Sequence, residues 1–138
     1  MTVEILKALH NKEVSILGSK WTLKVVDSSM DCYEYRTLVL QEANALTQIY
    51  MREIWINADC YITREDSQVM PADNPAIGQD LTHELYHAFF AESGLDICTG
   101  TSGCEDGWAR NETMIDWNAK MFPKILKVRK TLGISDKE

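Results

Sequence analysis

The chain has 138 residues, 45% of them hydrophobic, and its formal net charge at neutral pH is −7. That length and apolar content predict a single domain, residues 1–138, with a hydrophobic core. No run of about 18 apolar residues occurs, so a transmembrane helix is excluded, and the acidic balance argues against general nucleic-acid binding.

The N-terminal part of the chain, to about Thr63, is rich in β-branched and aromatic residues and predicts mainly β-sheet. Acidic residues near its start and the lack of a long apolar stretch predict no secretory signal, and hence a cytoplasmic protein with reduced cysteines. We expect a short helix over residues 4–10. The expected strands are residues 13–17, 21–27, 33–40 and 48–57, with Gly18-Ser19 as a hairpin turn between the first two.

A polar stretch at residues 64–73 predicts a loop, and a long helix over residues 74–93 should follow it. Asn74 and Pro75 are typical of a helix start, and Ser93-Gly94 of a helix end. A second helix is predicted over residues 108–122, and Pro123 should bend it or restart it as far as residue 132. One face of the first helix is expected to pack into the core through Leu81, Leu85, Ala88 and Phe89.

The segment His83-Glu84-Leu85-Tyr86-His87 lies within the first of these helices. Positions four apart lie about 40° apart around a helix, so both histidines project from one face, with Glu84 on the same flank. Two imidazole nitrogens can bind a metal ion that keeps an open coordination position, and a carboxylate beside it can take a proton from water. The motif therefore predicts a catalytic zinc site, with His83 and His87 as ligands and Glu84 as general base.

A catalytic zinc ion usually takes three protein ligands, so a further one is expected. Glu112, on the second helix, is the preferred candidate because Asp116 follows four residues later on the same helical face. The Asp116 carboxylate could accept the remaining N–H of a histidine ligand and fix the orientation of its ring. Glu105 and Asp106, in a glycine-rich stretch, stay open as alternative ligands.

The pattern His-Glu-x-x-His followed by Glu-x-x-x-Asp resembles that of the gluzincin class of zinc metallopeptidases. The chain is more similar still to the small single-domain forms encoded by bacteriophages and prophages, which are related to the ImmA/IrrE-type metallopeptidases. The residues that carry the resemblance are 81–96 (LTHELYHAFFAESGLD) and 111–125 (NETMIDWNAKMFPKI).

That resemblance implies a minimal zincin-like domain of the α+β class. A small antiparallel or mixed sheet would pack against the zinc-binding helix, and a second helix would carry the third ligand. It also implies one Zn²⁺ ion held by His83, His87 and Glu112, with Asp116 orienting a ligand, and a peptide or protein as substrate.

Three features of the site stay open at this point. Cys98 and Cys104 could form a disulfide or a second metal site. A substrate peptide could add to residues 52–57 if they form an edge strand. Gluzincins often use a histidine or tyrosine to stabilise the oxyanion, and the candidates here are His10, Tyr50, Tyr61 and Tyr86.

The sequence thus predicts a zinc-dependent metalloendopeptidase. Two other functions stay open: a zinc-containing regulatory or binding module with little turnover, and a phage assembly or host-takeover factor. Glu84 favours the enzyme, because a structural zinc site needs no base and usually fills all four positions with protein ligands. No nucleic-acid or membrane partner is expected, and the oligomeric state is left open.

Overall fold

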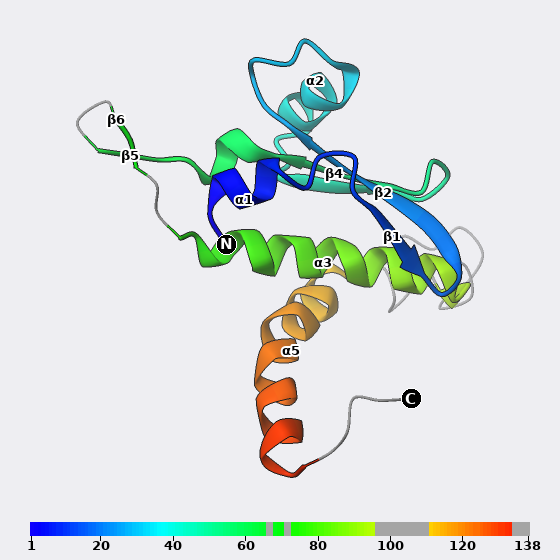
Figure 1. Ribbon diagram of the computed structural model, residues 1–138. Helices are drawn as coiled ribbons and strands as arrows, with labels where there is room; N and C mark the ends of the chain where they lie inside the picture. The colour runs from blue at the N-terminus through cyan, green and yellow to red at the C-terminus, as the bar shows by residue number, and fades with distance from the viewer. Residues whose placement is uncertain (66–67, 71–72, 96–110, 134–138) are drawn as a thin grey trace.

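The computed structural model describes residues 1–65, 68–70, 73–95 and 111–133. A four-stranded mixed sheet forms its centre, with helix α2 (Tyr33–Leu40) on one face and helices α1 (Val3–Lys7) and α3 (Pro75–Glu92) on the other (Figure 1). Helix α5 (Glu112–Thr131) packs mainly on α3 and extends away from the sheet. The expected α+β class with a mixed sheet is confirmed.

The sheet has the strand order β1-β2-β4-β3. Its strands are β1 (Glu13–Ile16), β2 (Ser19–Val26), β3 (Ala45–Gln48) and β4 (Glu53–Asn57). β2 and β4 are parallel, whereas the two outer pairs are antiparallel. β4 therefore lies inside the sheet, and the expectation that residues 52–57 could form an edge for a substrate peptide is wrong.

The hairpin between β1 and β2 turns at Leu17-Gly18, one residue earlier than predicted. Both residues have positive φ angles, 48° and 86°. This combination is typical of the type I′ turn, whose twist matches that of the flanking strands. Gly18 adopts the conformation at no steric cost, while Leu17 adopts it with an exposed side chain.

Residues 33–40, expected as a strand, form helix α2. The β-branched and aromatic composition misled the prediction, because strand preference largely reflects the packing environment. In the structure Leu38 is buried and Tyr35 packs beside it, near Trp55 of β4. A spacing of three residues places both side chains on one helical face.

Residues 48–57, expected as one strand, are divided by a turn over residues 49–52. Arg52 has a φ of 54°, and the Tyr50 and Met51 side chains are exposed. The apolar alternation hid this turn because its exposed residues are themselves apolar. A 3₁₀ turn (Ala58–Tyr61) follows β4.

The stretch 64–73 was expected as a loop, and that expectation is wrong. It contains most of a two-stranded hairpin formed by β5 (Thr63–Glu65) and β6 (Gln68–Met70).

Helix α3 begins after Asn74 and ends at Glu92, as predicted. Helix α5 continues through Pro123 to Thr131, so it does not restart at this proline, one of the two expected outcomes, although Pro123 cannot donate the backbone hydrogen bond of that position. Residues 108–110 of the predicted second helix lie outside the described residues. Among the described helices, none combines the length and apolar character needed to cross a membrane.

The hydrophobic core lies on both faces of the sheet. Between the sheet and α3, Ile54 and Ile56 of β4 pack with Ile77 and Ala88 of α3 in two neighbouring clusters. Leu81 and Leu85 pack against these clusters as expected, but Phe89 is exposed, and its assignment to the core is wrong. The sheet therefore holds α3 along most of its length.

Candidate metal centre

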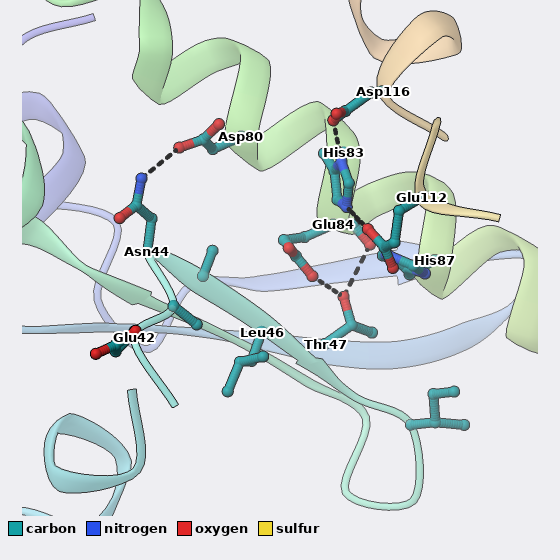
Figure 2. A pocket seen from close by; sticks show the side chains of 13 residues that line it. Glu42, Asn44, Leu46, Thr47, Asp80, His83, Glu84, His87, Glu112 and Asp116 are labelled. Carbon is teal, nitrogen blue, oxygen red and sulfur yellow. Dashed lines mark hydrogen bonds and ion pairs between the residues drawn. The ribbon is translucent and has the colours of Figure 1, made fainter. Parts of the chain in front are cut away.

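The two histidines of the motif lie in the middle of α3. The Asn74 side chain accepts a hydrogen bond from the Ala76 N–H at 3.0 Å, and Pro75 occupies the first turn, so the helix begins at a defined residue. Because Ile77 and Ala88 face the sheet, His83 and His87 project toward α5 (Figure 2).

Three possible ligand atoms from α3 and α5 converge beside each other (Figure 2). His83 Nε2 lies 3.1 Å from His87 Nε2 and 2.9 Å from Glu112 Oε2. His87 Nε2 lies 3.4 Å from Glu112 Oε1. Ligands about 2.0–2.1 Å from a tetrahedral zinc ion lie about 3.3 Å from one another, so these spacings fit such an ion.

The electrostatics of this cluster favour a proton or a cation shared between the three groups. Neutral imidazole and carboxylate groups present lone pairs, and three lone pairs at these distances repel unless a proton or a metal ion lies among them. Burial lowers the pKa of His87 and so favours its neutral form, the form that binds metals.

Asp116 interacts with the far side of the His83 ring. Its Oδ1 lies 2.7 Å from His83 Nδ1. The contact assigns the ring proton to Nδ1, which donates to the carboxylate, and directs the Nε2 lone pair toward His87 and Glu112. This contact is the one expected from the four-residue spacing of Glu112 and Asp116.

The start of α5 presents Glu112 and Asp116 to α3. The Asn111 side chain caps this start by accepting a hydrogen bond from the Met114 N–H at 2.9 Å. Ile115 and Ala119, one turn apart, are buried where the helix packs. Glu112 and Asp116 flank this buried row but remain 68% and 51% exposed.

Glu84 points from α3 toward strand β3 and is only 8% exposed (Figure 2). The Thr47 hydroxyl lies 2.6 Å from Glu84 Oε2 and 3.1 Å from the Glu84 backbone oxygen. Burial raises the pKa of the Glu84 carboxyl, while the Thr47 hydrogen bond opposes that shift. A buried carboxyl with a raised pKa, next to a cluster of possible ligands, is suited to accepting and returning a proton.

A pocket of about 620 Å³ opens over this cluster. One wall is the start of β3 and the residues before it, and the other is formed by α3 and the first turn of α5. The pocket therefore lies along a free edge of the sheet, because β3 is the outermost strand on this side.

The four oxyanion candidates lie outside the lining of this pocket. The Tyr61 hydroxyl donates to Asp80, and His10 Nδ1 accepts from the Val25 N–H. Tyr50 is fully exposed, and the Tyr86 ring contacts Phe90.

Four residues with an expected role lie outside the described ranges: Cys98, Cys104, Glu105 and Asp106. Of the remaining cysteines, Cys32 and Cys60 are both free.

Three hydrogen-bond contacts beside the pocket were not anticipated from the sequence. Thr47 holds Glu84, and Asn44 and Tyr61 both contact Asp80 of α3. Asp80 precedes His83 by three positions, so the helical repeat alone could have placed it on the face of the motif. No local signal marks Thr47, because its partner is 37 positions away.

Comparisons with models of known protein families, with curated proteins and with solved structures found no match to this chain.

Proposed function

We propose that this protein is a zinc-dependent metallopeptidase that hydrolyses peptide bonds, with Glu84 as general base. The observation that carries the proposal is the convergence of His83, His87 and Glu112 ligand atoms within 4.8 Å of one another, beside the buried Glu84 carboxyl. An open pocket next to a free strand edge supports a peptide substrate.

The donor set suits zinc. Two imidazoles and one carboxylate, with a fourth position open, form the usual ligand set of a catalytic zinc site. Zinc in such a site supplies Lewis acidity, which polarises a carbonyl group and makes water more acidic. Asp116 would hold the His83 ring in the tautomer that a metal requires.

The role of the protein's own groups follows from their positions. Glu84 would accept the proton of the attacking water and deliver it to the leaving amine, a transfer that suits a carboxyl with a raised pKa. Thr47 would keep the Glu84 side chain oriented through its 2.6 Å hydrogen bond.

Strand β3 offers a docking edge for an extended peptide. The Asn57 N–H donates to the Asn44 carbonyl at 2.9 Å, and the antiparallel register continues to Gln48 opposite Glu53. Hydrogen-bonded pairs alternate in such a ladder, so the backbone groups of Ala45 and Thr47 face the open edge. A substrate strand could pair with these groups and present its backbone to the metal centre.

The proposal is tested with zinc-loaded wild-type protein and the Glu84→Gln variant, each incubated with a peptide library whose products are read by mass spectrometry. We expect cleavage by the wild type and loss of cleavage in Glu84→Gln at unchanged zinc content. The matched control is Glu34→Gln, in the first turn of α2 on the opposite face of the sheet, and it should keep full activity. Cleavage that survives in Glu84→Gln would refute the proposed base.

Stoichiometric zinc without any cleavage by the wild type would instead favour the zinc-containing regulatory or binding module. Absence of metal binding would remove both functions.

A further inference from the structure

The pocket over the metal centre has an unusually one-sided charge. Among the residues that the structure describes, five carboxyl groups line it and no lysine or arginine does; the five are Glu42, Asp80, Glu84, Glu112 and Asp116. A divalent ion would offset only part of this charge. The converging metal-ligand atoms and the cavity define the site. The charge of the carboxylates then favours the approach of positively charged molecules.

Three of these carboxyl groups already have a role in the metal centre. Glu112 is a ligand candidate, Asp116 contacts His83, and Glu84 contacts Thr47. Asp80 and Glu42 are therefore the two that remain for recognition of a substrate. Of these, Asp80 lies on α3 itself, one turn before His83 (Figure 2).

The Asp80 carboxylate is held in place from two sides. The Tyr61 hydroxyl donates to its Oδ2 at 2.6 Å, and the Asn44 amide lies 3.4 Å from the same oxygen. Among the described residues, these hydrogen bonds involve Oδ2 and none involves Oδ1. Burial raises the pKa of Tyr61, and the Asp80 contact adds to this effect, so the phenol remains a donor to the carboxylate throughout the neutral range.

The position of Asp80 along the pocket defines which part of a substrate it can meet. Asn44 lies beside Asp80, and Thr47 lies beside Glu84. Three residues along a strand span about 10 Å, so a peptide paired with β3 passes from Glu84 to Asp80 over two or three of its own residues.

We propose that the pocket selects peptides with a lysine or arginine two or three residues from the scissile bond, on the side that lies over Asn44, and that Asp80 is the residue that determines this specificity. The inference rests on the proposed peptidase function, because it assumes a peptide paired with β3. A fixed carboxylate in a pocket whose described lining is otherwise acidic attracts an ammonium or guanidinium group and disfavours acidic side chains.

The test uses binding, so that turnover is not needed. We compare pairs of peptides that carry either lysine or norleucine at one position and are otherwise identical. The varied position lies two or three residues from a cleaved bond, on either side of it. Each peptide is titrated into the zinc-loaded Glu84→Gln protein. Where no bond is cleaved, a library with lysine scanned through each position replaces them. We expect the lysine peptide to bind about three- to fivefold more tightly, as is usual for a partly exposed ion pair, with the preference shrinking as salt rises.

The preference should disappear when Asp80→Asn is added, because the amide oxygen still accepts from Tyr61 but the charge is lost. Asp31→Asn is the matched control, since this aspartate is highly exposed and is not among the residues that line the pocket; it should leave the preference intact. Thermal unfolding of Asp80→Asn verifies that the fold is retained, and Asp80→Glu should recover part of the preference.

Equal binding of lysine and norleucine peptides, or no binding of either, overturns the inference. A preference that persists in Asp80→Asn overturns the role of Asp80. Lysine-dependent binding without any cleavage by the wild type leaves the charge selection standing and removes the proposed peptidase function, so the two failures are distinguishable.

Discussion

Helices α3 and α5 supply the two halves of the candidate metal centre in very different settings. His83 and His87 of α3 are 16% and 21% exposed, and their helix is packed along the sheet. Glu112 and Asp116 of α5 are 68% and 51% exposed. The buried row of α5, Ile115 and Ala119, is short.

The C-terminal end of α3 is also anchored to the sheet, and no similar anchor occurs among the described residues in the second half of α5. At the C-terminal end of α3, Glu92 accepts hydrogen bonds from Ser19 at 2.9 Å, Trp21 at 2.8 Å and Arg52 at 2.7 Å. The second half of α5 instead leaves Phe122, Ile125 and Val128 exposed.

This difference shows that the sheet and the core organise the histidine pair, whereas the carboxylate pair depends mainly on the contact between α5 and α3. Metal binding should therefore stabilise the docking of α5 more than it stabilises the sheet. The predictions that follow compare matched changes in the two helices.

The largest effect is expected for loss of a buried ligand. His87→Ala should weaken zinc binding strongly. Loss of a group that only hydrogen-bonds to a ligand lowers zinc affinity by roughly 10–100-fold, and loss of the ligand itself should lower it further. Glu112→Ala should weaken zinc binding less, because solvent can replace an exposed carboxylate. Metal analysis after dialysis against a graded chelator measures both; full zinc in His87→Ala contradicts the ligand assignment.

The second prediction concerns the two buried isoleucines Ile77 of α3 and Ile115 of α5. Ile77→Ala should lower the free energy of unfolding by about 2–5 kcal/mol, because it leaves a cavity in the main core. Ile115→Ala should cost less global stability but should weaken zinc binding and increase amide exchange in α5. Equal losses of global stability, with zinc affinity unchanged, would mean that α5 is part of one cooperative core.

Asp116→Ala should lower zinc affinity by roughly 10–100-fold while keeping the zinc stoichiometry at saturating metal. The physical reason is the loss of the acceptor for the His83 Nδ1–H, which frees the ring to change tautomer. Competition with a chromophoric chelator measures the affinity. Asp116→Asn is the informative companion, because its amide oxygen can still accept, and it should fall between the wild type and Asp116→Ala.

The smallest effect is expected at the Glu92 anchor. Its hydrogen bond with Arg52 is the main cause that holds the pKa of Glu92 below its ordinary value of 4.5. A lowered folded-state pKa contributes stability that is fully present above the unfolded pKa and is lost as the pH falls through the lowered value. Glu92→Gln should therefore reduce stability at pH 7 and reduce its acid dependence.

Denaturant unfolding at pH 7 and below pH 4 measures this effect. The control is Glu13→Gln, an exposed glutamate paired only with the exposed Lys20 at 3.2 Å, which should change neither quantity appreciably. An acid dependence in Glu92→Gln equal to that of the wild type would exclude the anchor.

Much of helix α3 could be predicted from the sequence, and the N-terminal strands less well. The Asn74-Pro75 start and the end after Glu92 follow local rules of capping and backbone geometry. Residues 33–40 instead form a helix because Leu38 and Tyr35 find a partner in Trp55, a contact that no local pattern encodes. The turn before β4 was not predicted for a different reason: its exposed residues Tyr50 and Met51 are apolar and continue the strand-like pattern.

The site divides in the same way. The pairing of Glu112 with the two histidines was expected from motif spacing, and the structure brings the three together. The contacts of Thr47 with Glu84 and of Asn44 with Asp80 were missed, because both depend on β3 lying next to α3. Residues 52–57 were expected at an edge but lie inside the sheet, since strand order is a property of the whole sheet.

By itself, the sequence determined that His83, Glu84 and His87 share one side of a helix, because a repeat of 3.6 residues acts within a single turn and needs no other part of the chain. Only the tertiary structure decided that Glu112 meets them, that Thr47 orients Glu84, and that β3 is the free edge beside them. Those outcomes join residues tens of positions apart, and packing of the sheet against α3, and of α3 against α5, is the physical cause that brings them together.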